Sequence, residues 1–284
     1  MSTPTTLRIC TPPAIAAART LLFVPGDRPD RSDKAAGSGA DLVVVDLEDA
    51  VAPEHKDRAR RAAAEWPGLG HRCVVRVNAP GTPWFEADLR MAAGLGCPVM
   101  VPKAEDPAVL AEVAARCTPI PLIETALGAE RAYEVCSVPG VVRAAFGNVD
   151  LAAQLGVAPD DTLALAYARS RLVLASTAAG ISAPVDGVTT VVRDTGALTA
   201  DTAHARRLGF TGKLCVHPAQ IAPVAAGFAP TEGELRWART VLGAGEAVTS
   251  VDGHMVDKPV LDRARGMLAR APEGARPGAR ATGD

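Results

Sequence analysis

The stretch Leu42-Val43-Val44-Val45-Asp46-Leu47-Glu48-Asp49 joins four apolar, mostly β-branched residues to a cluster of three acids. A short apolar run of this kind predicts a strand buried on both faces, as in a parallel sheet, with the acids at its carboxyl end. The same arrangement, an apolar run that ends in a polar residue or a Gly/Pro turn, recurs along the chain. We predict eight such strands: Thr20–Val24, Leu42–Asp46, Val74–Val77, Val99–Val101, Pro121–Glu124, Val142–Phe146, Ala183–Gly187 and Lys213–His217.

Longer segments with helical spacing separate most of these strands, and several begin at a recognisable cap. Asp106 precedes Pro107, which places an N-cap residue before a proline at the first helical position. Short buried strands that alternate with helices predict parallel pairing through right-handed crossovers. Eight units favour closure into a TIM (β/α)8 barrel, an α/β fold, over an open sheet. The predicted helices are His55–Trp66, Trp84–Leu95, Pro107–Cys117, Asp161–Ala179 and Asp201–Leu208.

The barrel is expected to occupy residues 19–230, after an N-terminal extension of residues 1–18. Residues 231–270 offer two more helices, Glu232–Leu242 and Pro259–Leu268, joined by the loop Gly243–Lys258. This C-terminal helical segment is expected to act as a lid over the barrel mouth or to reach a neighbouring subunit. Residues 271–284 are rich in Gly, Ala, Pro and Arg without a periodic apolar face, which predicts a disordered tail.

Composition narrows the possible partners. Hydrophobic residues make up 48% of the 284 residues and charged residues 22%, as in a globular protein with a large core. A net charge of −2 and the lack of a basic run interleaved with aromatics argue against nucleic acid as a partner. No signal-peptide pattern and no apolar run of membrane length is present, so we expect a cytoplasmic protein without a membrane partner. The six scattered cysteines predict reduced, buried side chains.

Ionisable residues follow most of the predicted strands. In a TIM barrel the carboxyl ends of the strands converge on one face, where catalysis takes place. Glu48, Arg76, Lys103, Glu124 and Asp150 all follow or end a predicted strand, so we expect them to share that face. A ring of charge at this position indicates a functional site rather than an ordinary solvated rim.

The residue types present favour a hard cation. Carboxylates without a nearby Cys/His cluster suit magnesium, which takes one or two carboxylates and leaves positions for water and substrate. The histidines show no zinc-binding spacing, and His217 is expected to form hydrogen bonds rather than bind metal. No nucleophile elbow, P-loop or dinucleotide fingerprint is present. Lys103 is the best candidate for a Schiff-base amine, although pairing with the acidic residues is the preferred interpretation.

Seven motifs follow one another at the predicted strand ends. They are LFVPG at 22–26, DLEDAV at 46–51, VRVN at 75–78, VPK at 101–103, IETA at 123–126, FGNVDL at 146–151 and GKLCVHP at 212–218. In this order they resemble the HpcH/HpaI aldolase/citrate lyase superfamily, in particular its citrate lyase beta subunit-like and malyl-CoA lyase branch. The likeness extends from about Arg19 to about Leu268 and implies a TIM barrel, a magnesium ion and reversible cleavage of a 3-hydroxyacyl thioester.

Carried over by position, this resemblance implies a role for individual residues. Glu124 and Asp150 match the magnesium ligands, and Arg76 matches an arginine that contacts the oxo-acid portion of the substrate. The residues matched to coenzyme A are a weaker assignment. Arg28 and Lys34 are equally well explained as cations on a solvated helix face. The positions matched to the thioester and coenzyme A moiety are Phe23, Arg28, Lys34 and Val149.

The segment Gly253–Pro259 resembles the lid of the superfamily. Its aspartate, here Asp257, corresponds to a residue that completes the active site of an adjacent subunit, which implies a homotrimer or a dimer of trimers. Asp257 is also placed to cap the helix that begins at Pro259. We expect Asp257 to act as acid or base at the enolate carbon, with Glu48 as the alternative.

The resemblance implies cleavage of a 3-hydroxyacyl-CoA, such as malyl-, citramalyl- or citryl-CoA, into acetyl-CoA and a 2-oxo acid. Three alternatives remain open. One is a malyl-CoA-type thioesterase, in which water replaces the carbon–carbon cleavage step. A second is the beta subunit of a citrate lyase complex, whose thioester is carried by an acyl carrier protein. The third is a catalytically silent protein that binds an oxo acid.

Overall fold

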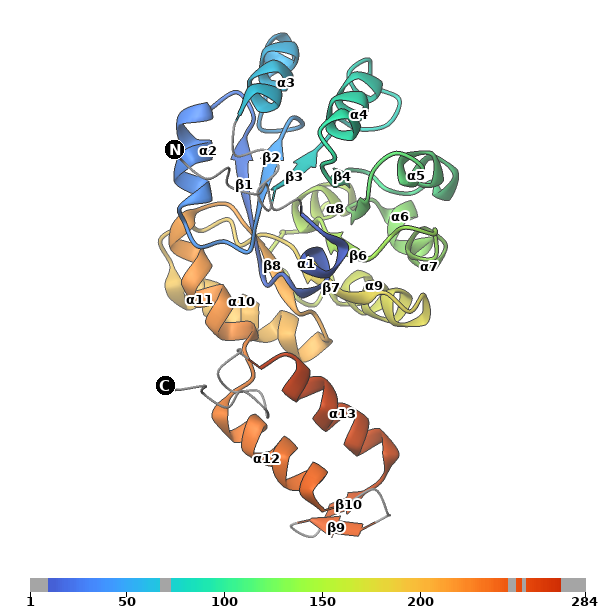
Figure 1. Ribbon diagram of the computed structural model, residues 1–284, viewed down its shortest axis with the longest axis vertical. Coiled ribbons are helices and arrows are strands. Elements are labelled where there is room, and N and C mark those ends of the chain that lie inside the picture. The colour runs from blue at the N-terminus through green and yellow to red at the C-terminus, as the bar shows by residue number, and fades with distance from the viewer. Residues whose placement is uncertain (1–9, 67–72, 245–248, 252–253, 272–284) are drawn as a thin grey trace, which may run out of the picture. The chain divides into compact units, whose positions relative to one another are not determined.

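The computed structural model describes residues 10–66, 73–244, 249–251 and 254–271. The chain divides into two compact units, Met1–Gly227 and Phe228–Asp284. In the first unit, eight parallel strands close into a barrel in chain order, which confirms the predicted TIM barrel (Figure 1). The strands are β1 Thr20–Pro25, β2 Leu42–Asp46, β3 Cys73–Arg76, β4 Val99–Val101, β5 Pro119–Ile123, β6 Arg143–Phe146, β7 Ser182–Asp186 and β8 Gly212–Cys215.

The register of the strands brings their polar ends together. Asp46 at the end of β2 pairs with Pro25 of β1 on one side and with Arg76 of β3 on the other. The barrel closes between β1 and β8, where Thr20 pairs with Lys213. Because the strands are parallel, the residues that follow each of them emerge at the same end of the barrel.

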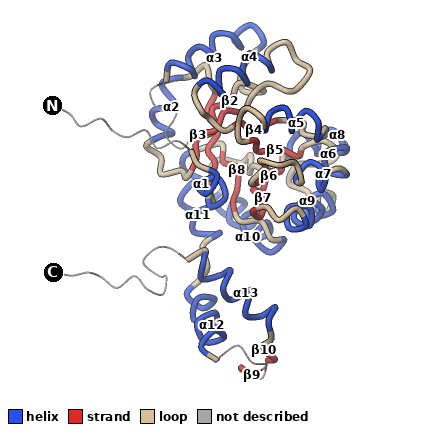
Figure 2. Tube along the Cα trace, turned by 45° about the vertical axis from the view of Figure 1, so that its right-hand side comes forward, coloured by secondary structure: helices blue, strands red, loops and turns tan. Residues whose placement is uncertain are grey.

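Helices enclose the barrel, as Figure 2 shows with the strands in red inside them. The predicted cap of α5 is present, since the Asp106 side chain accepts a hydrogen bond from the Ala108 N–H. Predicted helix 161–179 is shorter than expected, because the regular helix α9 begins at Ala166. The helices around the strands are α2 Pro29–Ala36, α3 Lys56–Glu65, α4 Phe85–Gly94, α5 Pro107–Ala114, α6 Ala126–Glu130, α7 Ala132–Cys136, α8 Asn148–Leu155, α9 Ala166–Ala178, α10 Thr195–Leu208 and α11 Ile221–Phe228.

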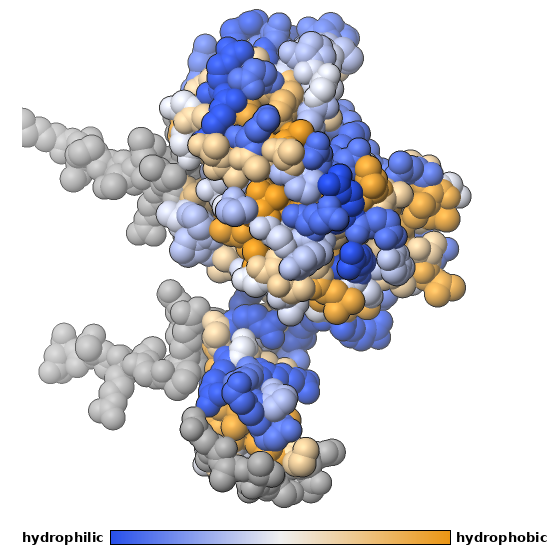
Figure 3. Space-filling model, turned by 90° about the vertical axis from the view of Figure 1, so that its right-hand side faces the viewer, coloured by the Kyte–Doolittle hydropathy of each residue, from blue (hydrophilic) through white to orange (hydrophobic). Residues whose placement is uncertain are grey.

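The outer surface of these helices carries single apolar side chains among polar ones. Figure 3, which views the side of the barrel where α6, α7 and α9 lie, shows hydrophilic residues with apolar groups between them. Scattered exposed apolar residues of this kind are normal for a globular protein. On these three helices they include Leu127, Tyr133, Tyr167 and Leu174.

The N-terminal segment contributes to the barrel core. Helix α1, Pro12–Ala17, lies in the middle of the barrel in Figure 1, and Ile15 and Ala18 belong to the same buried cluster as the barrel-lining residues. The fully buried Arg143 of β6 donates hydrogen bonds to the backbone oxygens of Ile15 and Ala18 and to that of Ala183. Within the predicted extension, residues 10–18 therefore close one end of the barrel, while residues 1–9 lie outside the described part of the chain.

The second unit contains two helices and a short hairpin. The helices are α12 Glu232–Gly243 and α13 Lys258–Ala269, and the hairpin pairs β9 Thr249–Val251 with β10 His254–Val256. Thr231 and Glu234 form a capping box at the start of α12. Of the predicted tail, 271–284, only Ala271 is described, and it is buried in the core of this unit. None of the helices in the described ranges is long and apolar enough to span a membrane.

Candidate active site at the mouth of the barrel

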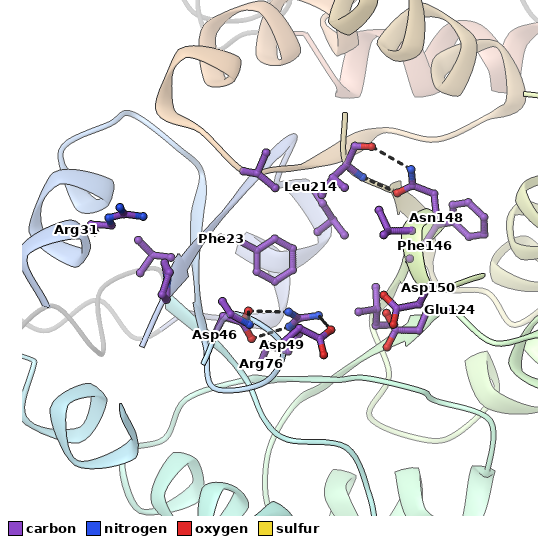
Figure 4. Close-up of a pocket in the computed structure, with 18 residues that line it drawn as sticks. Phe23, Arg31, Asp46, Asp49, Arg76, Glu124, Phe146, Asn148, Asp150 and Leu214 are labelled. Atoms are coloured by element: carbon purple, nitrogen blue, oxygen red, sulfur yellow. Dashed lines mark hydrogen bonds and ion pairs between the residues drawn. The ribbon is translucent and has the colours of Figure 1, made fainter. Parts of the chain in front are cut away.

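A cavity of about 400 Å3 opens at the carboxyl ends of the strands (Figure 4). Apolar side chains from the barrel interior form part of its wall, among them Leu122, Val188 and Leu214. The polar residues Asp46, Asp49, Arg76, Glu124, Asn148 and Asp150 form the rest, with Arg31 at the edge. A concave site with an apolar wall and a few convergent charged groups is typical of a small-molecule pocket.

Glu124 and Asp150, the predicted metal ligands, lie next to each other in this cavity (Figure 4). Glu124 follows β5 and is almost fully buried, whereas Asp150 lies in the first turn of α8 and is partly exposed. Gly147 permits their approach, because a Cβ at that position would lie 2.4 Å from the Glu124 Cβ and 2.6 Å from its Oε2. The glycine in the FGNVDL motif is therefore required by the position of the Glu124 side chain.

Lys103, after β4, contacts three carboxylates. Its Nζ lies 2.8 Å from Glu48 Oε1, 3.8 Å from Asp150 Oδ1 and 3.9 Å from Glu124 Oε1. Burial by itself would lower the pKa of Lys103, but the hydrogen bond and the charges of Glu48 and Glu124 outweigh it and raise the pKa. A Schiff-base lysine needs a lowered pKa, so the structure favours the predicted pairing with acidic residues.

Burial makes the negative charge of these carboxylates costly. It raises the pKa of Glu124 to about 8, and the charges of Glu48 and Asp150 act in the same direction. Burial also raises the pKa of Glu48, against the opposing charge of Arg76 and the hydrogen bond from Lys103. The Oε2 atom of Glu48 is buried without a hydrogen bond, although Arg76 Nη1 lies 3.0 Å away as an ion pair. A divalent cation among these oxygens would stabilise their ionised forms.

The donor set fits magnesium better than a transition metal. Among the residues that the structure describes, no group of three or more His, Cys, Asp or Glu side chains is arranged to hold a metal by itself. Magnesium does not need such a cage, since it is commonly bound through one or two carboxylates together with water and substrate oxygens. The neighbouring oxygens of Glu124 and Asp150, open to the cavity, match that requirement.

Arg76 lies across the cavity from Glu124 and Asp150, and Asp46 on the neighbouring strand holds it in place (Figure 4). Its Nε lies 2.8 Å from Asp46 Oδ1 and its Nη2 lies 2.6 Å from Oδ2, a two-point contact. Asp46 also accepts hydrogen bonds from the N–H groups of Glu48 and Ala50. The guanidinium centre lies 4.9 Å from the centroid of the Phe23 ring. Arg76 therefore has a fixed orientation, with Nη1 3.0 Å from Glu48 Oε2 and 3.5 Å from Asp49 Oδ2.

Of the four residues predicted to bind coenzyme A, two line the cavity and two do not. Phe23 and Val149 line the cavity, whereas Arg28 and Lys34 are exposed side chains outside its lining. Arg28 forms an ion pair with Asp30 at 3.1 Å. Arg31, three residues from each of them on α2, lines the cavity but was not predicted as a site residue, because a helix of eight residues gives little periodic signal.

Two further polar residues, Asn148 and His217, shape the loops around the site. The Asn148 amide donates to the backbone oxygens of Pro159 and Val188 and accepts from the Val188 N–H, which joins the loops after β6 and β7. Sequence reasoning gave Asn148 no role, since its partners are backbone groups distant in sequence. His217 accepts a hydrogen bond from the Ala219 N–H through Nδ1, as expected for a hydrogen-bonding histidine.

Asp257 lies in the second unit, between β10 and α13. Its side chain accepts a hydrogen bond from the Val260 N–H at 3.4 Å, so it caps α13 as the sequence suggested. This contact leaves the second carboxylate oxygen available. The predicted catalytic role of Asp257 is compatible with the cap, because one oxygen suffices for a capping bond.

The fold and the site together define a class of protein: a TIM barrel with two neighbouring carboxylates and an anchored arginine at the carboxyl ends of its strands, the face where TIM-barrel enzymes carry their active sites. The model of the HpcH/HpaI aldolase/citrate lyase family matches residues 19–218. The chain belongs to this family, and its relatives include proteins named for the beta subunit of citrate lyase. The resemblance predicted from the ordered motifs is thereby confirmed.

Relatives and solved structures cover nearly the whole chain. A citrate lyase subunit beta-like protein of Mycobacterium tuberculosis is 40% identical over 91% of this chain and 97% of its own length. A (3S)-malyl-CoA thioesterase of Cereibacter sphaeroides is 36% identical over 89% and 94%. The CitE protein of M. tuberculosis, solved with magnesium, acetoacetate and coenzyme A, superposes with a TM-score of 0.81 at 38% identity, over 90% of this chain and 99% of its own.

Proposed function

We propose that this protein is a magnesium-dependent carbon–carbon lyase that reversibly cleaves a 3-hydroxyacyl-CoA into acetyl-CoA and a 2-oxo acid. One observation carries the proposal: the Glu124 and Asp150 carboxylates lie together in the cavity with Arg76, which Asp46 holds in a fixed orientation. The CitE structure with magnesium, acetoacetate and coenzyme A supports the choice of cofactor and of substrate class. Malyl-, citramalyl- and citryl-CoA are the candidate substrates.

Cleavage moves one negative charge between two oxygens of the substrate. The hydroxyl gives its proton to a base; the carbon–carbon bond then breaks, the alkoxide becomes the ketone of the 2-oxo acid, and the electron pair forms a thioester enolate that takes up a proton to give acetyl-CoA. Magnesium held by Glu124 and Asp150 would supply Lewis-acid polarisation of the oxo-acid oxygens. Arg76 donates hydrogen bonds to the same acid through the nitrogen that Asp46 does not engage, and its fixed orientation removes the cost of ordering it during the reaction.

Two carboxyl groups are candidates for moving protons at the enolate carbon. Asp257 is our first choice, provided by the lid of an adjacent subunit in a homotrimer or a dimer of trimers. Glu48 is the alternative within the barrel, because burial raises its pKa toward the range useful for proton transfer. If Asp257 transfers the proton, the active site is complete only in the oligomer. If Glu48 does, a single barrel suffices.

Replacing Asp257 with serine is expected to stop the exchange of acetyl-CoA methyl protons with solvent deuterium, measured by NMR. Serine is chosen because it can still cap α13, whereas Asp257→Ala also removes the cap, which costs about 1 kcal/mol of stability. Both variants are expected to lose exchange, but only the alanine variant should unfold earlier on heating. Wild-type exchange in the serine variant would assign the proton transfer to Glu48 or to another group.

A thioesterase is the second candidate function, favoured by the name of the Cereibacter sphaeroides relative. The two reactions give different products from malyl-CoA. Carbon–carbon cleavage yields acetyl-CoA and glyoxylate, whereas hydrolysis yields free coenzyme A and malate. A third possibility, the beta subunit of a citrate lyase complex, requires a thioester on an acyl carrier protein and predicts that free CoA esters are not turned over.

We expect one of malyl-, citramalyl-, citryl- and 3-hydroxy-3-methylglutaryl-CoA to be cleaved with magnesium to acetyl-CoA and an oxo acid. A single methyl group changes kcat/KM by about 10- to 200-fold in an apolar pocket, so one substrate should dominate. Chromatography of the CoA products, with an assay for the oxo acid, distinguishes the reactions. Release of free coenzyme A without any oxo acid would replace the lyase proposal by the thioesterase.

A further inference from the structure

The backbone at Lys103 has an unusual conformation that serves the carboxylate cluster. Its φ of 49° is the only positive value at a non-glycine residue among those that the structure describes. This left-handed conformation is unfavourable for a residue with a Cβ and persists where surrounding contacts determine it. Here it directs the Lys103 N–H to Glu124 Oε1 at 2.9 Å, so one residue binds Glu124 through its backbone and approaches it with its side chain.

Among the residues that the structure describes, Lys103 is the cation that forms ion pairs with both predicted metal ligands. It approaches Asp150 to 3.8 Å and Glu124 to 3.9 Å, distances of ion pairing rather than of hydrogen bonding. Its hydrogen bond goes to Glu48 at 2.8 Å. The side chain is 41% exposed, so it can move without repacking the barrel core. Lys103 is thus anchored to Glu48 while its charge is shared with the other two carboxylates.

A metal ion held by Glu124 and Asp150 would lie close to this ammonium. Magnesium binds carboxylate oxygens at about 2.0–2.1 Å, so an ion on Glu124 Oε1 or Asp150 Oδ1 would lie within about 6 Å of Nζ as the lysine now stands. At that separation two like charges repel strongly in a partly buried site. The ammonium and the metal therefore compete for the same negative charge.

We infer that Lys103 acts as the counter-charge of the carboxylate cluster in the metal-free protein and limits how tightly the cluster binds a divalent cation. The inference rests on the function proposed above and adds a residue that regulates metal occupancy. When the cation enters, Lys103 keeps its hydrogen bond to Glu48 and gives up its ion pairs with Glu124 and Asp150. We therefore expect the cluster to bind magnesium weakly without substrate. Oxygens of the bound substrate would supply the additional ligands that make the binding tight.

The test is the affinity of the full-length protein for magnesium, measured by calorimetry after treatment with EDTA and without substrate. Lys103→Met removes the charge at similar length, and it is expected to bind magnesium at least about tenfold more tightly than the wild type. Without metal, the same variant should unfold at a lower temperature, because three carboxylates lose their counter-charge. Lys103→Arg keeps the charge and serves as the matched control, with an affinity close to that of the wild type.

The outcomes separate this inference from the proposed function. Equal or weaker magnesium binding by a folded Lys103→Met, with clear binding by the wild type, would overturn the role of Lys103 and leave the lyase proposal standing. If Lys103→Met does not fold, Lys103→Gln provides the same neutral substitution with a hydrogen-bonding amide. If neither the wild type nor a neutral variant binds magnesium without substrate, the role of Lys103 is overturned. The lyase proposal is tested separately, by magnesium-dependent turnover of the CoA esters.

Discussion

Glu124→Gln and Asp150→Asn are each expected to lower magnesium-dependent kcat by at least about a thousandfold. Each substitution keeps the size of the side chain and removes one negative oxygen from the carboxylate pair. Glu124 should be the more sensitive position, because it is almost fully buried and its backbone contact with Lys103 fixes its direction. Steady-state turnover of the best CoA ester, with and without magnesium, provides the measurement.

Folding has to be separated from catalysis in this experiment. Without metal, the unfolding temperature of Glu124→Gln should be unchanged or slightly raised, since burial makes the Glu124 charge unfavourable. That of Asp150→Asn should stay close to the wild type, because this carboxylate is partly exposed. Glu134→Gln is a suitable control, because that carboxylate is exposed on α7 and pairs with Arg131 away from the cavity. Full turnover by either ligand variant would remove that residue from the metal site.

The second large effect concerns stability. Asp186→Asn is expected to lower the free energy of unfolding by about 3–5 kcal/mol. Asp186 is buried at the end of β7, and its oxygens lie 2.9 Å from Arg169 Nε and 3.0 Å from Lys213 Nζ, both also buried. The substitution leaves two cations in the barrel without an anion. Arg169 also lies 5.0 Å from the ring centroid of Phe146, a wall of the cavity, so KM should rise as well.

The stability of Asp186→Asn is measured by urea unfolding. Its control is a substitution of an exposed carboxylate that also contacts two cations. Glu86 provides one, since it also contacts two cations, Arg90 and Arg116, but on the surface. Glu86→Gln should leave the urea midpoint almost unchanged, because exposed ion pairs contribute little. Equal effects of the two substitutions would contradict the importance assigned to burial.

The effect of Asp186 should also depend on pH. Burial alone would raise its pKa, but the charges of Lys213 and Arg169 outweigh burial and lower the pKa. A carboxylate with a lowered folded-state pKa contributes stability above its unfolded value, about 3.9, and loses it as pH falls through the folded value. The difference between wild type and Asp186→Asn should therefore be constant above about pH 5 and narrow below about pH 4.

The barrel could be predicted from sequence because its strands are short, apolar and bounded by polar residues. All eight predicted strands lie within two residues of the observed ones at either end. Several helices were not predicted, and the reason is their length. Helices α6 and α7 have five residues each, too few for a helical period to appear. Helix α10 begins at Thr195, six residues before the predicted start, because its cap Asp194 was not recognised.

The site was predictable to the extent that strand ends converge. Glu124, Arg76 and Lys103 follow from that rule, which needs only the order of the strands. The clamp of Asp46 on Arg76 does not, because it depends on the register between β2 and β3. Arg28 and Lys34 were predicted from the resemblance, and they stay predictions. Arg31 could not be predicted, because its place at the cavity depends on which face α2 turns toward it.

The closure of the barrel by α1 has a consequence for the order of folding. Arg143 donates a hydrogen bond to the Ile15 backbone oxygen across 128 positions of sequence. During synthesis, residues 10–18 cannot form their hydrogen bonds with Arg143 until β6 has left the ribosome. Contacts of such long range slow folding, because the entropy of closing the intervening chain is lost before they form. Residues 10–18 therefore gain these contacts only after the much later strand β6 has been made.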